Sequence, residues 1–379
     1  MQWDRLRAYL DTLSSAGVPG CDLIVSRDHQ VLFRHTAGTG DAEGKRPVRG
    51  DELYWLFSCT KVFTTCAAMQ LIGQGKLHPD DPVAKYLPAY RNLTVRDGEN
   101  VRPAERMMIV RHLMSMQSGL DYDLNRPAVR RAIEETGGKA DTRRLADAMA
   151  EDPLCFEPGT DFLYSLSHDV LAAIIEVVSG EKFSAYLARH ILEPLELRDF
   201  SFSLTDRNRD RLAAIFQREE DGTLTLCPPD SNNYRLTDAY ESGGAGLIGS
   251  TEEYARFVDA LACGGQGKDG QKILPPEMIQ LWRANQLTAN SRRSFDLWNR
   301  RGYSYALGVR TRVDLSTGGA GNLGEFGWDG AAGAWTMIDP DTHLSAFFAM
   351  HVRNFGYAYD VIHPTIRSLI YECVRERNP

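Results

Sequence analysis

The stretch Ser58-Cys59-Thr60-Lys61 decides how this chain is interpreted, because it opens a segment, residues 58–73, that we expect to be helical. Residues three positions apart on a helix share a face, so the Ser58 hydroxyl and the Lys61 amine are predicted to lie side by side. Such an amine can take the proton of a hydroxyl nucleophile without a histidine. Ser-x-x-Lys is therefore a candidate acylation motif, whereas Cys59 points about 100° away and is expected to pack.

A second copy of the motif, Ser179-Gly180-Glu181-Lys182, shows that a four-residue pattern also arises by chance. This copy contains a glycine and follows a long apolar segment, so we expect it to be the C-terminus of a helix. No helix would then fix the geometry of the serine and the lysine. We interpret only the copy at Ser58 and Lys61 as a candidate site.

The composition is that of an ordinary soluble globular protein, with 43% hydrophobic and 25% charged residues among 379. A net charge of −8 and a pI of about 5.7 do not indicate a nucleic-acid partner or an anionic membrane. The first residues carry charges early and no apolar run follows, so neither a signal peptide nor a membrane span is expected. Seven cysteines without paired spacing predict reduced thiols and a cytoplasmic location.

The order of predicted elements indicates an α+β fold. Apolar stretches at 21–26 and 31–37 predict a hairpin. From about 77 to 197 we expect short helices such as 110–116 and a long one at 169–179, with few strands. Later strands are expected at 211–217, 303–310, 326–327, 334–339 and 344–352, with helices at 251–262 and 360–375. We therefore predict an antiparallel sheet domain from residues 1–80 and 201–379, flanked by helices, with an inserted helical domain at 81–200. A cleft between two such domains is a usual place for a site.

Several familiar site patterns are missing or lack their context. A dinucleotide site needs a strand before Gly-x-Gly-x-x-Gly and a helix after it. The match at 244–249 is followed by a helix but has no buried strand before it, and the match at 319–324 lies before a strand. The sequence contains neither His-Glu-x-x-His nor a Cys-x-x-Cys pair, which makes a dedicated metal site unexpected. The Gly-x-Ser-x-Gly elbow is also absent. The sequence predicts no cofactor.

Three further segments fit a serine acyl-transfer site. Tyr164, at the expected domain boundary, could reach Ser58 and Lys61. Phenols and lysines both titrate near ~10. A neighbouring ammonium favours a phenolate and burial lowers the pKa of a lysine, so either group could be the general base. The small residues of 326–333 would let a substrate carbonyl approach a backbone N–H, and residues 242–247 form a third glycine-rich turn.

In this order and spacing, the segments resemble the class C β-lactamase and penicillin-binding serine hydrolases, and especially the family VIII carboxylesterases. The resemblance runs from about residue 18 to 370 and implies a β-lactamase/transpeptidase-like fold. Its markers are Ser58-x-x-Lys61, residues 112–120, Pro158-Gly159, Tyr164-Ser165, residues 242–247 and Trp328-Asp329-Gly330.

The resemblance implies a role for each site residue. Ser58 would be the acylated nucleophile, and Lys61 would accept its proton or depress the pKa of Tyr164. Tyr164 would activate the nucleophile and later protonate the leaving group, while the backbone N–H groups of Ser58 and Ala331 would form the oxyanion pair. The structural alternatives are a helix N-cap for Ser58, a surface charge for Lys61 and a core aromatic for Tyr164.

Two departures from the β-lactamase and peptidase patterns bear on the substrate. Leu166 stands where those enzymes have an asparagine that orients a substrate amide. Trp328-Asp329-Gly330 replaces Lys-Thr-Gly, so a cation for a substrate carboxylate is missing and Asp329 would repel one if it faced the cleft. Arg353 is a candidate replacement cation, with an ordinary surface arginine as the alternative.

These features together predict a carboxylesterase that acts on small neutral esters through a covalent acyl-enzyme. Leu166 and Trp328 would line an apolar pocket, and we add Asp329, Gly330 and Arg353 to the predicted substrate-binding residues. The alternatives are an amide-cleaving β-lactamase or D-amino-acid peptidase, and a catalytically weak penicillin-binding-like sensor or scaffold. The expected partner is a small ester or amide, with no nucleic acid or membrane; the oligomeric state stays open.

Overall fold

A seven-stranded antiparallel sheet in the order β2-β1-β13-β12-β11-β10-β9 organises the computed structural model, which describes residues 3–206 and 208–375. Its strands are β1 (Gly20–Arg27), β2 (Gln30–Gly38), β9 (Tyr303–Tyr305), β10 (Arg310–Arg312), β11 (Phe326–Gly327), β12 (Trp335–Asp339) and β13 (Leu344–Met350). Both ends of the sequence therefore contribute to one sheet, as predicted. The α+β class is confirmed.

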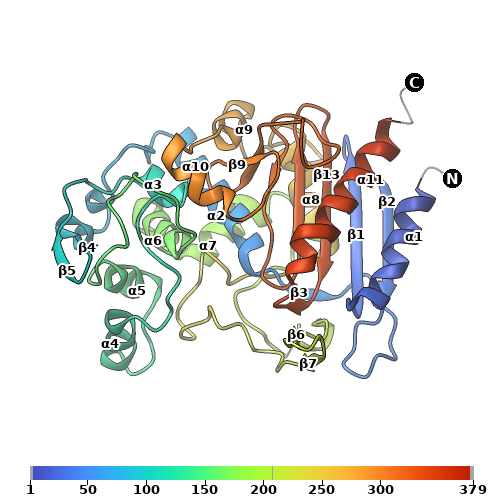
Figure 1. Ribbon diagram of the computed structural model, residues 1–379, viewed down its shortest axis with the longest axis horizontal. Coiled ribbons are helices and arrows are strands. Elements are labelled where there is room, and N and C mark those ends of the chain that lie inside the picture. Colours follow the sequence, from blue (N-terminus) through green and yellow to red (C-terminus); the bar gives the residue numbers. More distant parts are fainter. Residues whose placement is uncertain (1–2, 207, 376–379) are drawn as a thin grey trace.

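Helices flank this sheet, and three small sheets of two or three short strands lie outside it. The helices are α1 (Asp4–Thr12), α2 (Thr60–Gly73), α3 (Val110–Met114), α4 (Pro127–Glu135), α5 (Thr142–Met149), α6 (Ser167–Ser179), α7 (Phe183–Leu187), α8 (Thr251–Ala262), α9 (Pro276–Arg283), α10 (Ala289–Asp296) and α11 (His363–Arg375). The small sheets are β3 (Leu53–Trp55) with β8 (Ile248–Ser250), β4 (Thr94–Asp97) with β5 (Asn100–Pro103), and β14 (Val352–Arg353) with β6 (Phe216–Arg218) and β7 (Leu224–Leu226). Figure 1 shows α1 and α11 together beside β1 and β2, and α4, α5 and α6 at the opposite end.

Alternation along the central strands gives the sheet two apolar faces. Leu23 and Val25 of β1 belong to the cluster shared with α1 and α11, whereas Ile24 between them belongs to the cluster on the other face. Phe348 and Phe347 of β13 divide in the same way. Because β1 pairs with β13 over seven consecutive residues, a slip of one residue would exchange the two faces.

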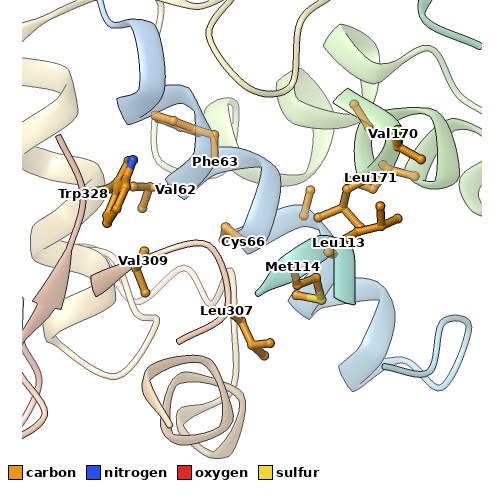
Figure 2. Close-up of a cluster of buried hydrophobic side chains, with 14 of the residues drawn as sticks. Val62, Phe63, Cys66, Leu113, Met114, Val170, Leu171, Leu307, Val309 and Trp328 are labelled. Carbon is orange, nitrogen blue, oxygen red and sulfur yellow. The ribbon is translucent and has the colours of Figure 1, made fainter. Parts of the chain in front are cut away.

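Helix α2 is the centre of the larger apolar cluster. Every residue from Thr60 to Leu71 is buried, as expected for a helix that is surrounded by other elements. Figure 2 shows the side chains that α2 shares with α3, α6 and the β9–β10 connection: Val62, Phe63, Cys66, Leu113, Met114, Val170, Leu171, Leu307 and Val309. The N-terminal end of α2 therefore lies where the sheet and the helices meet.

Several predicted elements have other limits in the structure. The strand expected at 303–310 is two strands, because Gly308 adopts φ +76° and the chain turns back with Ala306 N–H bonded to Val309 O. The strand expected at 211–217 is largely irregular, and only β6 forms there. The helical region contains the unpredicted hairpin β4–β5, whose turn uses Gly98 at φ +61°.

The boundaries that we predicted near residues 80 and 200 stay a proposal. The stretch 81–200 contains α3 to α7, and the central strands lie outside it, which agrees with the proposed division. Over the two described ranges, no helix is both long enough and apolar enough to cross a bilayer. The predicted cytoplasmic location also stays a prediction.

Candidate active site

Ser58 lies immediately before α2, in a 3-10 turn formed by Phe57–Cys59. We predicted a helix from Ser58 itself, but α2 begins at Thr60. Phe57 adopts φ +45°, a conformation that a bulky residue holds only when its surroundings impose it. The backbone of Leu56 is tied to Leu247 O at 2.9 Å, and the Phe57 ring is packed edge-on against a tyrosine. The strained turn presents the Ser58 hydroxyl, and Cys59 is buried, as predicted.

The Lys61 amine lies beside the Ser58 hydroxyl, as the helical spacing predicted. Its Nζ is 3.2 Å from Ser58 Oγ, 3.1 Å from Tyr122 Oη and 2.7 Å from Gly244 O. Burial lowers the pKa of Lys61 to about 7, so much of the amine is neutral at neutral pH. A neutral amine has two N–H donors and one lone pair. With two contacts taking the N–H groups, the lone pair can accept the Ser58 proton.

A buried carboxylate holds the turn that supplies the Gly244 carbonyl. Asp169 Oδ1 accepts hydrogen bonds from Tyr240 Oη at 2.5 Å, Ser242 Oγ at 2.6 Å and the Gly244 N–H at 3.4 Å. A Cβ on Gly244 would lie 2.5 Å from Asp169 Oδ2, so a larger residue here would displace this carboxylate. Our sequence analysis missed Asp169, although its position in the first turn of α6, five residues after Tyr164, was a usable signal.

Tyr164 completes the predicted trio. Lys61 Nζ lies 4.6 Å from the centre of its ring, and Trp328 Nε1 donates a hydrogen bond of 2.8 Å to its hydroxyl. Burial raises the pKa of Tyr164 well above its usual value, and hydrogen bonds with Ser58 and Trp328 oppose this only in part. A phenolate is therefore disfavoured. Of the two candidate bases, Lys61 is the better one, and Tyr164 is suited to donate a proton.

Tyr122 is a second phenol at the site, and we did not predict it. Its ring stacks on that of Tyr164 with centres 5.4 Å apart, and its hydroxyl contacts Lys61. Tyr122 lies two residues after the marker segment 112–120, so an aromatic residue just beyond that segment was the available signal. The rings of Tyr122 and Tyr164 therefore cover the buried Lys61 amine with aromatic surface.

The marker segments around residues 118 and 165 have a structural purpose. Buried hydroxyls join them, because Ser167 Oγ lies 2.7 Å from both Ser118 Oγ and Ser165 Oγ. Backbone bonds from Leu163 to Met116 and from Leu166 to Asp121 connect the same two segments. This connection fixes the loop that carries Tyr164 against the loop that carries Tyr122.

Ala331 lies in the turn between β11 and β12, and this turn closely approaches the segment before Ser58. A Cβ on Gly330 would be 2.4 Å from Leu56 O, so only glycine permits the approach. Within residues 3–206 and 208–375, the Ala331 N–H has no hydrogen-bond partner and is available to an oxyanion. Ala331 also packs against the apolar cluster that contains Phe57. The oxyanion roles of Ser58 and Ala331 stay proposals.

The structure gives Trp328 and Leu166 different surroundings from those predicted. Only 2% of Trp328 and 3% of Leu166 are exposed, so neither offers the open apolar wall that we expected. Trp328 instead orients the Tyr164 hydroxyl, and Leu166 packs in the core. The half-buried rings of Trp298, which packs on Tyr164, and Tyr234, which packs on Tyr122, are better candidates for an apolar wall.

The Asp329 carboxylate is paired with two arginines. Arg310 Nη1 contacts its carboxylate at 2.8 Å and Arg300 Nη2 at 3.5 Å. Burial acts to raise the pKa of Asp329, but these guanidiniums hold it below its usual range. The predicted substrate-binding role of Asp329 stays a prediction, and its charge is already paired with two guanidiniums. Gly330 beside it serves the close approach to Leu56.

Arg353 lies at the edge of this region, in β14. Its Nη1 donates to Ser231 O at 3.2 Å, and its charge acts on the neighbouring Tyr234 phenol. Its predicted role as a cation for a substrate carboxylate stays a prediction. Over the described ranges, the group of three close potential metal ligands consists of His29, Asp259 and Cys263, and it includes no residue of this site.

Comparisons with known proteins agree with this arrangement. A family model described as Beta-lactamase matches residues 5–361. Esterase EstB of Burkholderia gladioli is 28% identical over 386 residues, covering 93% of this chain and 91% of that protein. A putative D-alanyl-D-alanine carboxypeptidase of Escherichia coli K12 is 25% identical over 360 residues, covering 87% and 77%. The solved structure of "EstCE1, a hydrolase with promiscuous acyltransferase activity" superposes with a TM-score of 0.80 at 25% identity, covering 98% of both chains.

Proposed function

This chain belongs to the beta-lactamase family and has its fold, and from that premise we propose that it hydrolyses small neutral carboxylic esters through a covalent acyl-enzyme. One observation carries the proposal: a fully buried amine with a lowered pKa lies 3.2 Å from the hydroxyl of Ser58. A base poised near the working pH activates a hydroxyl nucleophile most effectively.

In the acylation step, Ser58 Oγ attacks the ester carbonyl and its proton passes to the Lys61 lone pair. The backbone N–H groups of Ser58 and Ala331 then hold the negative oxygen; losing one such donor typically costs about 10²–10³ in rate. As the carbonyl re-forms, the alcohol leaves with a proton from the neutral Tyr164 phenol. The proton held by Lys61 replaces the one that Tyr164 gives up.

In the deacylation step, water takes the place of the alcohol. Tyr164 and Lys61 remove one proton from the water as its oxygen attacks the acyl carbon. The bond to Ser58 Oγ then breaks, and Lys61 returns a proton to the serine. The products are the carboxylic acid and the free enzyme, and no cofactor takes part.

The surroundings of Ser58 favour esters over amides that carry a carboxylate. Leu166 cannot orient a substrate amide, and Asp329 engages the nearby guanidinium of Arg310. The accessible surface near Lys61 is aromatic, from Tyr122 and Tyr234. The names of EstB and EstCE1 support this choice, while the carboxypeptidase relative supports the peptidase alternative.

The test is hydrolysis of short p-nitrophenyl esters by the wild type and by Ser58→Ala. We expect Ser58→Ala to lose at least about 10³-fold in kcat. The matched control is Ser179→Ala, in the second Ser-x-x-Lys copy, where the hydroxyl donates to Ile175 O at 2.7 Å and accepts from the Glu181 N–H at 3.1 Å. Full activity in Ser58→Ala, or an equal loss in Ser179→Ala, would refute the assignment.

Two parallel measurements separate the alternatives. A chromogenic cephalosporin that is cleaved faster than every ester would favour a β-lactamase or peptidase. Mass spectrometry of the intact protein after mixing with an ester would identify a sensor, because the acyl adduct on Ser58 would then persist without turnover.

A further inference from the structure

The turn between β1 and β2 and the last turn of α8 bring three potential metal ligands together. His29 Nδ1 lies 2.7 Å from Asp259 Oδ2, and one ligand atom from each of His29, Asp259 and Cys263 lies within 4.8 Å of the others. Figure 1 shows α8 against the central sheet, where it packs on β1 and β13. None of the three residues belongs to the site around Ser58.

Backbone geometry holds the three side chains in this arrangement. Asp28 and His29 form the two-residue hairpin turn, at φ +50° and +63°, the left-handed conformation that such tight turns require. Asp259 and Cys263 are four residues apart, so they share one face at the end of α8. Gly264 and Gly265 follow at positive φ, so the chain reverses directly after Cys263.

A second observation points to a missing ligand. Asp259 is only 7% exposed, and its Oδ1 has no hydrogen-bond partner among the described residues. Its other oxygen already contacts His29. A buried carboxylate oxygen without a donor is costly, and a cation would satisfy it. Asp259 and His29 also line a cavity of about 580 Å³, which offers a path for an ion and for water.

We propose that His29, Asp259 and Cys263 bind one divalent transition-metal ion of the zinc type, with water from the cavity as a fourth ligand. A nitrogen, oxygen and sulfur set in this combination suits Zn²⁺ or Co²⁺ and disfavours Mg²⁺ and Ca²⁺. As the metal–sulfur bond forms, the thiol proton passes to water and no oxidation state changes. Bonds of ~2.0–2.3 Å set the size of a tetrahedral site. His29 Nδ1 and Asp259 Oδ2, which are 2.7 Å apart, must therefore separate slightly, and any pair near the 4.8 Å limit must close.

The same three residue types could instead suggest a cysteine nucleophile with a His–Asp pair. That role would leave Asp259 Oδ1 without a partner among the described residues, whereas a bound cation would satisfy it. The nearby Asp28 carboxylate pairs with His343 Nδ1 at 2.7 Å and adds negative charge that favours a cation. A bound ion would connect the turn between β1 and β2, through His29, to the end of α8, through Asp259 and Cys263.

The test is a Co²⁺ titration of the full chain without an affinity tag. We expect one Co²⁺ per chain, with the near-ultraviolet thiolate band and the visible bands of a tetrahedral site. Cys263→Ser should abolish the thiolate band and weaken binding at least about 100-fold. The matched control is Cys227→Ser, another half-buried cysteine, whose sulfur donates to the Thr225 carbonyl and packs on a different apolar cluster, and it should bind like the wild type.

A second readout keeps the test decisive if Cys263→Ser folds poorly. Zn²⁺ should raise the Tm of the wild type and of Cys227→Ser but not that of His29→Asn, because binding to the native state alone stabilises it. Asparagine tolerates the left-handed conformation of position 29. Ester hydrolysis should stay within about twofold in every variant. A wild type without a thiolate band, or a band that survives in Cys263→Ser, would overturn the proposal.

Discussion

Two buried basic side chains, Lys61 and Arg310, differ in whether they keep their proton: the pKa of Lys61 is lowered and that of Arg310 is raised. Lys61 is separated from Asp169 by the backbone of Gly244, so burial dominates and lowers the pKa of the amine to about 7. Arg310 contacts Asp329 directly at 2.8 Å, and both groups stay charged. The interposed backbone is the difference. A carboxylate held at a distance positions a cation without fixing its proton, whereas a direct ion pair makes the charge permanent.

The largest expected effect is the loss of activity when the Lys61 amine, which accepts and returns the serine proton, is removed. Lys61→Met should lower kcat/KM for p-nitrophenyl esters by about 10³-fold or more, since the general base is removed while the volume is nearly kept. Lys182→Met is the control, because Lys182 is largely exposed and only pairs with Glu241. Comparable losses in the two variants would mean that Lys61 has no special role.

Breaking the ion pair of Arg310 and Asp329 should lower the free energy of unfolding. Arg310→Met leaves the Asp329 carboxylate buried without its main partner, and we expect a loss of about 3–5 kcal/mol in the free energy of unfolding. Urea denaturation measures this loss. The exposed pair of Arg292 and Asp296 provides the control, where Arg292→Met should cost less than about 1 kcal/mol. Adding Asp329→Asn to Arg310→Met should restore part of the stability.

The lowered pKa of Lys61 predicts two pH dependences. The value of kcat/KM should rise as pH increases through about 7, when the buried ammonium loses its proton. Between about 7 and the ordinary value of 10.5, the unfolded chain binds a proton that the native chain does not. The free energy of unfolding should therefore rise with pH across this window, by at most about 1.4 kcal/mol per pH unit.

The comparison that isolates this contribution is the wild type against Lys61→Met. Urea denaturation of both proteins at several pH values gives the difference in the free energy of unfolding. Parallel curves between pH 7 and 10 would show that Lys61 is not a depressed lysine.

The smallest expected effect concerns Asp169. Its negative charge raises the pKa of Lys61, against the larger effect of burial, so Asp169→Asn should move the acidic limb of the kcat/KM profile slightly to lower pH. The asparagine keeps an oxygen that can accept from Tyr240 and Ser242. Asp147→Asn, on α5, is the control and should leave the limb in place. A limb displaced to higher pH would contradict this electrostatic role.

A spacing of three positions was enough to predict the contact between Ser58 and Lys61, because the 3-10 turn that holds Ser58 runs directly into α2 and keeps both side chains on one face. The partners of Lys61 were beyond such reasoning. Tyr122 and Gly244 are 61 and 183 residues away, and only tertiary packing brings them to the amine. Apolar stretches and the order of the elements likewise predicted the main sheet, while the turn at Gly308 was missed inside a strand-like stretch.

The predicted substrate-binding residues show a different limit. The sequence indicated that Trp328 and Asp329 lie between two strands, but not which way each side chain points. Although they are neighbours in the chain, the Trp328 side chain contacts the Tyr164 hydroxyl and the Asp329 side chain contacts Arg310. The partner of Asp329 comes from a strand 19 residues earlier, and nothing in the local pattern identifies it.

The pairing of β1 with β13 has a consequence for biosynthesis. Cys21 to Arg27 emerge from the ribosome more than 300 residues before Leu344 to Met350, the partners to which they bond. Until those partners arrive, the early hairpin exposes one unpaired strand edge and two apolar faces. Ser58 is likewise synthesised long before the Ala331 turn that completes its surroundings. Nascent chains stalled before β12 should therefore be aggregation-prone and unable to turn over esters.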